Sequence, residues 1–354
     1  MKEVLTKWYR RYLSEEEAVV LLVLLASAFG VTLAFGDILA PVLVAVILAY
    51  LMQGVANFMR HRGLPAEVSV AISTLLFFGG FVAVLFGLAP LVWRQLVALV
   101  REAPAMIEAG RKVLVTLPDE YPVFFTQQQV NELTSVIQAE MASIGQMLVT
   151  KGLSSIPSML ALLVYLILIP LMVFFFLKDR DQLIGWFSGF LPERRPLLDR
   201  IWSELNLQFA NYARGKGIEI LIIGGASYLV FAVLSLNYAA LLGLLVGFSV
   251  IVPYIGATLV TIPVVVVAYA QFGVTPDFLW VFGAYAVIQV LDGNVLVPLL
   301  FSEAVNLHPV AIVIAVLFFG GLWGLWGVFF AIPLATLVNA ILSAWPSREA
   351  LPRA

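Results

Sequence analysis

The sequence predicts an all-α, polytopic transmembrane protein with about eight membrane segments. Its composition is the first indication: 62% of the residues are hydrophobic, 12% are charged and the mean hydropathy is +1.01. Between Gly217 and Ser347 there is no Lys or Arg, and the acidic residues are few. Such a stretch cannot form a water-exposed surface, because hydration of a globular exterior needs charges of both signs. Gly and Pro also interrupt it where a simple spanning helix would be continuous, which is typical of transporters.

A helix needs roughly 20 apolar residues to cross a bilayer, and eight apolar segments are candidates. The segments are Ala18–Phe35, Ile38–Met52, Val68–Val92, Ile156–Leu177, Ile218–Leu236, Ala239–Gln271, Phe278–Leu300 and Pro309–Ala344. Lys and Arg gather before the first segment, after the second and between the fourth and fifth. The positive-inside rule makes these regions cytoplasmic. Both termini are then expected in the cytoplasm.

Four parts follow along the chain. Residues 1–92 hold N-terminal membrane helices, and 93–155 form an outer amphipathic helical insertion. Residues 156–217 hold the fourth membrane helix and a cytoplasmic interfacial helix, and 218–347 form a transport core. In the insertion, apolar residues recur at helical spacing over 130–148. This helix is expected either to lie on the outer leaflet or a neighbouring subunit, or to pack on the preceding helix.

Two segments of the core are expected to be re-entrant hairpins. Ala239–Val252 would be about 21 Å long as a helix, too short for a hydrocarbon core of about 30 Å. Pro253 and Gly256 would form the tip of this hairpin. Pro309–Ala344 is too long for one straight crossing. Its breaks are Gly320, Gly321 and Gly324, and Pro333 lies in the returning leg.

The two hairpins suggest an inverted repeat. Each follows one membrane helix, and the second hairpin would enter from the opposite side. A shift of 70 residues places Phe248 on Phe318, and Ile262-Pro263 on Ile332-Pro333. Few other positions match, so the repeat is inferred from breaks and segment lengths.

Asp292 is the main candidate for a functional side chain. It is followed by Gly293 and Asn294 and precedes Pro298 in an otherwise apolar segment. A charged side chain at the centre of a membrane helix costs about 3 kcal/mol or more, so a compensating role is expected, such as binding a cation or relaying a proton. The alternative is that Asp-Gly-Asn marks a helix break at which Asp292 caps the next turn.

Four further polar residues are candidates for contacts with a solute, and Asn294, two residues after Asp292, is one of them. Tyr254 lies at the first hairpin tip, while Glu303 and Asn306 occupy a short polar connector before Pro309. A merely solvated loop is the alternative for the connector. Glu219, close to Lys216, is expected to face the membrane interface.

Several classes of function are excluded. The chain has no cysteine and two histidines, so disulfides, thiolate sites and imidazole metal clusters are not expected. It lacks the phosphate-binding loop of ATP-driven pumps, and no H-E-x-x-H or nucleophile motif is present. We therefore expect no enzyme activity, no metal and no cofactor. The net charge of -2 gives no sign of a nucleic-acid partner.

Several motifs taken together resemble the autoinducer-2 exporter family of bacterial membrane proteins. They are Pro253-Tyr254-Ile255-Gly256, Asp292 to Pro298, Asn306-Leu307-His308-Pro309, the glycines of 320–327 and Ala331-Ile332-Pro333-Leu334-Ala335. The resemblance covers nearly the whole chain. It implies a homo-oligomeric secondary transporter of the bacterial inner membrane, named for export of a furanone quorum-sensing signal. Some members of that family are assigned sodium or proton antiport.

Three functions remain open at this point. The leading hypothesis is export of a small polar metabolite or signal, coupled to Na⁺ or H⁺. The second is a monovalent cation/proton antiporter in which Asp292 is the exchanged carboxylate. The third is a non-transporting membrane scaffold whose outer helices bind a partner.

Overall fold

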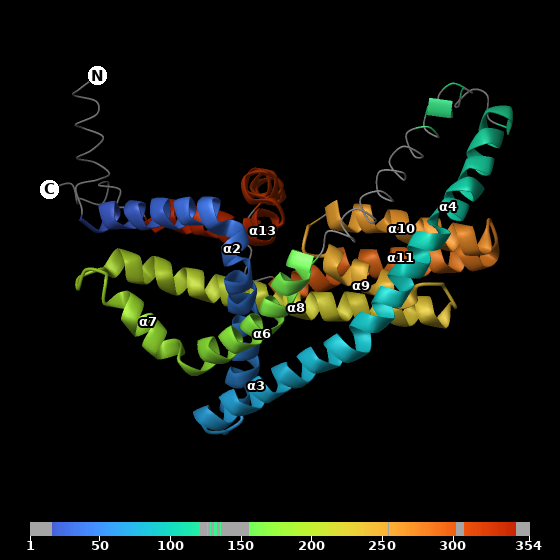
Figure 1. Ribbon diagram of the computed structural model, residues 1–354. Helices are drawn as coiled ribbons and strands as arrows, with labels where there is room; N and C mark the ends of the chain where they lie inside the picture. The colour runs from blue at the N-terminus through green and yellow to red at the C-terminus, as the bar shows by residue number, and fades with distance from the viewer. Residues whose placement is uncertain are drawn as a thin grey trace, which may run out of the picture. The chain divides into compact units, whose positions relative to one another are not determined.

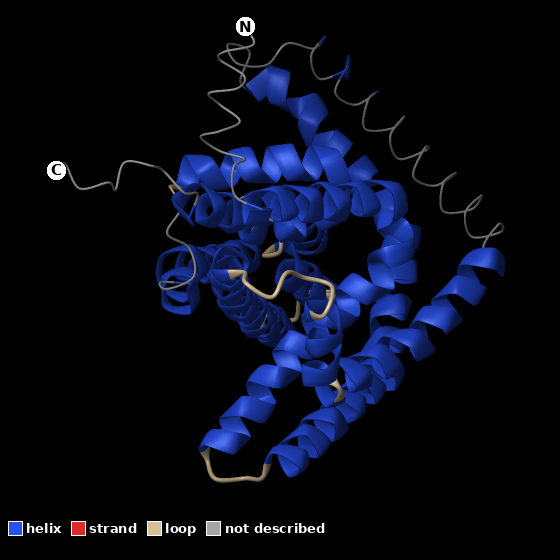
Figure 2. Ribbon diagram, turned by 90° about the vertical axis from the view of Figure 1, so that its left-hand side faces the viewer, coloured by secondary structure: helices blue, strands red, loops and turns tan. Residues whose placement is uncertain are grey.

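The computed structural model describes residues 16–120, 126, 128, 131–132, 135, 156–253, 255–301 and 308–344. All regular elements of this part are helices, as Figures 1 and 2 show, so the predicted all-α class is confirmed. The expected helix over 130–148 lies largely outside the described residues. The predicted division of the chain into four parts stays a prediction.

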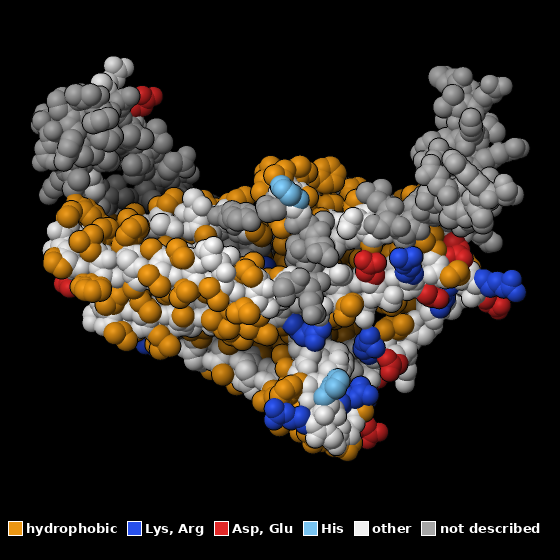
Figure 3. Space-filling model, turned by 180° about the vertical axis from the view of Figure 1, so that it is seen from behind, with side chains coloured by type: hydrophobic (Ala, Val, Ile, Leu, Met, Phe, Trp, Pro, Cys, Tyr) orange, Lys and Arg blue, Asp and Glu red, His pale blue; other side chains and the backbone are white. Residues whose placement is uncertain are grey.

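Membrane-spanning character is evident from helix length and surface. Six helices of the described part are long and apolar enough to cross a membrane, and shorter apolar helices accompany them. Hydrophobic side chains cover much of the described helical surface visible in Figure 3. An apolar exterior of this kind is stable only in contact with lipid or another protein.

The chain divides into two compact units. The first comprises Met1–Phe77, Leu168–Ile218 and Val297–Ala354, and the second comprises Phe78–Ile167 and Glu219–Leu296. Each unit contains one of the two predicted hairpins.

In the first unit, helix α2 (Glu16–His61) is bent (Figure 1), and the non-helical backbone angles lie at Phe35. The predicted link at 35–38 is therefore a kink within one helix, not a loop. Pro41 follows the kink, and a proline inside a helix removes a backbone donor and clashes with an earlier carbonyl. Before the kink, Leu21 packs on Leu198 and Ile201. After the kink, α2 packs on α6 (Ile156–Lys178).

Helix α8 (Pro196–Val233) joins two elements that the sequence separates, the interfacial helix and the fifth membrane segment. Its two intervening glycines do not end the helix, because neighbours fill the space beside them. A Cβ at Gly215 would lie only 2.6 Å from the ring of Phe301, and Leu51 fills the corresponding space at Gly217. These glycines therefore allow close packing inside the first unit.

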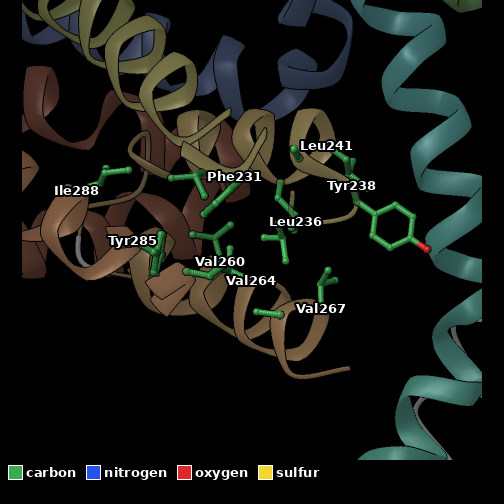
Figure 4. Packing of buried hydrophobic residues seen from close by; sticks show 14 of the residues in the cluster. Phe231, Leu236, Tyr238, Leu241, Val260, Val264, Val267, Tyr285 and Ile288 are labelled. Carbon is green, nitrogen blue, oxygen red and sulfur yellow. The ribbon is translucent and has the colours of Figure 1, made fainter. Parts of the chain in front are cut away.

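The core of the second unit is formed by the end of α8 with three further helices, which are α9 (Ala239–Ser249), α10 (Ile255–Phe272) and α11 (Pro276–Leu291). Figure 4 shows Phe231, Val260 and Val264 facing one another in this core. Small residues let α8 and α9 approach closely. A Cβ at Gly247 would lie 2.9 Å from the Cα of Gly224. This is how helices pack in membranes, where close backbone contact replaces the hydrophobic effect.

The first predicted hairpin is present as α9, a short turn and α10. At its tip, the backbone of Gly256 lies against the carbonyl oxygen of Ser249, with no room for a side chain. At its base, Gln271 donates from Nε2 to the carbonyl of Ser235 at 2.8 Å and accepts from the backbone of Asn237 at 2.7 Å. The two legs are thus connected at both ends.

Helix α4 (Ala89–Glu120) packs on this hairpin through polar contacts as well as apolar ones. Gln95 accepts a hydrogen bond from the backbone of Leu241 at 2.8 Å. Tyr238 points towards α4 in Figure 4 and hydrogen bonds to Glu102. Burial, together with this carboxylate, raises the pKa of Tyr238 to about 12. The phenol can therefore donate to the Glu102 carboxylate and link α4 to the hairpin.

The second predicted hairpin is α13 (Pro309–Ala344), which turns at Gly324. Gly324 has φ 59° and ψ −133°, a conformation that only glycine adopts readily. The backbone of Gly327 lies against the carbonyl of Phe319, and Ala331 packs on Ala315 and Val316 across the turn. Both hairpins thus close in the same manner, through a glycine placed against an earlier carbonyl.

Water access at the two tips is the first testable prediction. The turns leave backbone polar groups that lipid cannot satisfy, so we expect each tip to face water or a polar cavity. Because the native chain has no cysteine, Pro253→Cys and Gly321→Cys should each react with small water-soluble maleimides in cells. Gly321 is chosen for the second tip because Gly324 has a positive φ, which a cysteine would strain. Gly321 has no positive φ and has open space beside it. If neither cysteine reacts in intact or permeabilised cells, both breaks are ordinary kinks surrounded by lipid.

Candidate functional site

The candidate site begins with the inward face of α11. Val281, Tyr285 and Ile288 are buried at a spacing of four and three residues, and they pack on the core of the second unit. Asp292 comes four residues later and continues this stripe. Its side chain is partly buried, and its Oδ1 atom is shielded from solvent. The sequence pattern therefore places the carboxylate on the protein-facing side of an apolar helix.

Asp292 opens a π-helical turn, η2 (Asp292–Leu296), which leads into α12 (Val297–Phe301). The wide turn has a local cause, because Pro298 lacks a backbone N–H and would clash with a carbonyl four residues earlier. The same relation recurs at η1 (Val84–Leu88), which precedes Pro90. π-Turns inside helices are frequent at functional sites.

The turn bears on the alternative role of Asp292 as a helix cap. Asp292 has right-handed helical angles, φ −57° and ψ −60°, and the helix continues through it. A capping residue instead precedes a new helix and has extended angles. Asn294 donates from its side chain to the carbonyl of Val290 at 2.9 Å, so its amide serves the wide turn.

A polar network that sequence analysis missed lies beside this stripe. Tyr285 and Thr261 share a hydrogen bond of 2.9 Å between their hydroxyl groups, and Gln289 donates to the Tyr285 hydroxyl at 3.0 Å. Thr261 also donates to the carbonyl of Ala257, one residue after Gly256 at the hairpin tip. The network thus connects α11, three residues before Asp292, to the tip of the first hairpin.

The remaining predicted residues are distributed as follows. Pro253 and Gly256 lie at the first hairpin tip, and Gly293 is exposed in the π-turn. Pro298 is exposed on α12. Tyr254, Glu303 and Asn306 lie outside the described residues. On α13, Gly320 and Gly321 precede the turn at Gly324, and Pro333 is buried in the second leg.

Glu219 is a second acidic residue with an unexpected position. It was expected to face the membrane interface, but only 1% of its surface is exposed. Lys216, three residues earlier on α8, is 5% exposed, and its Nζ lies 5.2 Å from the ring centre of Phe301. Helix periodicity cannot reveal such burial, since α8 is apolar on several faces. Across the described residues, no group of three His, Cys, Asp or Glu side chains could hold a metal ion.

Known proteins resemble this chain over almost its whole length. The sequence profile of AI-2E family transporters matches residues 18–347. The provisionally named permease PerM of Escherichia coli (strain K12) is 45% identical over 349 residues, which cover 99% of both chains. The provisionally named transport protein YueF of Bacillus subtilis (strain 168) is 25% identical over 307 residues, 85% of this chain and 82% of its own.

A third relative, the provisionally named transport protein MT0215 of Mycobacterium tuberculosis, is 27% identical over 339 residues, 94% of this chain and 88% of its own. These matches confirm the predicted family. They agree with the membrane-spanning helices of the described residues. The chain therefore belongs to the AI-2E family of transporters, and it is a multi-pass membrane transporter, not an enzyme.

Proposed function

We propose that the protein is a secondary transporter that exports a small polar metabolite or signal, such as an autoinducer-2-like furanone, in exchange for Na⁺ or H⁺. The observation that carries this proposal is the carboxylate of Asp292 on the inward stripe of α11, at a π-turn. A charge in that position costs about 3 kcal/mol or more in a membrane helix, and a bound cation or proton offsets the cost. Occupancy of Asp292 then couples the ion gradient to a conformational change.

The neighbouring polar network supports the handling of a polar solute. Hydroxyl and amide groups of Thr261, Tyr285 and Gln289 lie in an otherwise apolar core, and they hold α11 to the first hairpin. A change of ion occupancy at Asp292 can alter this contact, because the carboxylate is three residues from Gln289. The tip at Pro253–Gly256 would then open or close access to the site.

Cation/proton antiport is the second candidate. One observation favours it: the side-chain amide of Asn294 is already bonded to the carbonyl of Val290. This bond occupies one donor of an amide expected to bind an organic solute, whereas antiport needs little beyond the acid.

The proposed setting is the bacterial inner membrane with both chain ends in the cytoplasm. Lys and Arg flank the N-terminal segments and the chain before α8, as the positive-inside rule requires. A homo-oligomer is proposed from the apolar stripe over 130–148, which would bury its face against a neighbouring subunit.

Reconstitution tests the proposal directly. The purified protein is placed in liposomes with a pH-sensitive dye inside, and Na⁺, K⁺ or a candidate furanone is added. Export coupled to H⁺ predicts a dye response that requires both the furanone and a proton gradient. Export coupled to Na⁺ predicts uptake of radiolabelled Na⁺ that requires the furanone, with no dye response. A response to the ion alone identifies antiport. If radiolabelled solute and ions all equilibrate no faster than in empty liposomes, transport by this chain is refuted and the scaffold hypothesis gains support.

A further inference from the structure

A cavity of about 450 Å³ lies in the first unit, between the second part of α2, the start of α7 (Arg180–Ser188) and the first half of α8. Its volume is within the range of about 300–1,000 Å³ that is usual for small-molecule sites. Three arginines line it, Arg60, Arg180 and Arg214, and none of the lining residues, all from the described part of the chain, is acidic. The sequence gives no hint of this cluster, because its members are far apart along the chain.

The charges of these arginines are only weakly compensated. Arg180 bonds to Asp181 at 3.2 Å, but the Asp181 side chain is 94% exposed, and such solvent-screened pairs contribute little. Arg214 uses Nε and one terminal nitrogen for Ala210 and Asn211, both on its own helix. Among the described residues, Arg60 has no carboxylate partner. The cavity therefore has a positive potential that favours an anion.

The uncharged lining side chains present donors. Tyr50 donates its hydroxyl to Oδ1 of Asn206 at 2.8 Å, and Gln53 donates to Oδ1 of Asn57 at 2.9 Å. These bonds use the amide oxygens of both asparagines. Their N–H groups remain as donors beside the guanidinium groups, which suits the oxygens of an anion.

One arginine is held in place by close packing. The methylene stem of Arg214 crosses α2 at Gly54, and its Cδ atom lies 2.5 Å from the position of a Cβ there. Any larger residue at position 54 would displace this stem. Gly54 thus gives Arg214 its place in the cavity wall, and the site is built by the packing of two helices.

The helix that begins at the cavity also carries a cluster of exposed aromatic side chains. Trp186, Phe187 and Phe190, at the end of α7 and just beyond it, are 61%, 64% and 72% exposed, and the Trp186 ring contacts both phenylalanine rings. Clustered exposed aromatic side chains are typical of the headgroup level of a bilayer. Arg180 begins the same helix about 9 Å away along its axis. The cavity is therefore within reach of both aqueous solutes and lipid headgroups.

We propose that this cavity binds a phosphate ester that carries hydroxyl groups. The guanidinium groups of Arg60, Arg180 and Arg214 take the phosphate oxygens, and the Asn, Gln and Tyr side chains bind the hydroxylated part. Both a free phosphorylated solute and the headgroup of phosphatidylglycerol have this chemistry. The inference does not depend on the proposed export function or on Asp292.

Binding measurements on the full-length protein in phosphate-free detergent solution test the proposal. Glycerol 3-phosphate and phosphatidylglycerol are each titrated into the protein, with glycerol and diacylglycerol as their phosphate-free controls. The readouts are the unfolding temperature and Kd. At least one phosphate compound should bind and raise the unfolding temperature, whereas its phosphate-free counterpart should not. Binding of glycerol 3-phosphate assigns the site to soluble esters, and binding of phosphatidylglycerol alone assigns it to lipid.

Paired charge variants distinguish the cavity from general surface charge. Arg60→Gln with Arg180→Gln should weaken binding at least about tenfold, because charge-assisted hydrogen bonds are lost. Arg194→Gln with Arg200→Gln removes the same charge from exposed positions that do not line the cavity and should leave Kd within about twofold. Arg60→Gln alone serves if the cavity double variant does not fold. The proposal is overturned if neither phosphate compound binds, or if both pairs of substitutions weaken binding equally.

Discussion

Asp292→Asn is expected to abolish coupled transport and to leave the protein folded. Asparagine has nearly the same size and still forms hydrogen bonds, but it cannot exchange a proton or hold a cation by charge. Removing the charge also removes a desolvation cost, so the unfolding temperature should not fall. In the liposome assay, the ion-dependent signal should drop to the level of empty liposomes.

Two further variants make this experiment specific. Asp292→Glu should retain part of the activity with a shifted pH optimum, because a longer acid has a different depth and environment. Asp277→Asn is the matched control, since Asp277 is an exposed acid in the first turn of the same helix. Wild-type coupled transport by Asp292→Asn between about pH 6 and 8 would contradict the carboxylate mechanism.

Replacing the glycines that close the hairpins is expected to cause a large loss of stability. A methyl group at Gly256 would collide with the backbone carbonyl of Ser249, and one at Gly327 would collide with that of Phe319. Backbone cannot give way as a flexible side chain can, so the turns must shift. We expect Gly256→Ala and Gly327→Ala each to destabilise the protein by about 3 kcal/mol, at the upper end of overpacking costs.

Other helical glycines provide controls with the opposite sign. Gly225 and Gly321 have open space where a Cβ would be. Alanine there relieves the entropic cost of glycine and should stabilise the protein by about 0.5–1 kcal/mol. Thermal unfolding in detergent, followed by tryptophan fluorescence, measures all four variants. If Gly256→Ala and Gly225→Ala unfold at the same temperature, the tip does not close as described.

The sequence predicted the features that depend on local chemistry. Pro253, Gly256 and Gly324 mark both turns because glycine and proline restrict or widen backbone angles at the positions where they occur. Continuity of helices was harder to predict. Gly215 and Gly217 resemble a break between two elements, yet α8 continues because Phe301 and Leu51 occupy the free space.

The polar features were missed for a different reason. Tyr50, Asn206 and Arg180 meet at one cavity although more than a hundred residues separate Tyr50 from either of the others. The hydrogen bond between Thr261 and Tyr285 likewise joins two helices. Periodicity within one segment carries no information on such pairs, whereas a lone acid such as Asp292 is conspicuous because its neighbours are apolar.

The π-turn at Asp292–Leu296 has a geometric consequence for the helix that carries it. A wide turn accommodates one more residue than an α-helical turn, so every later side chain is rotated by about 100° around the axis relative to an unbroken α-helix. Deleting one residue within the turn would remove this rotation, but Pro298 would still lack the N–H that an ordinary helix needs and would clash with the preceding turn.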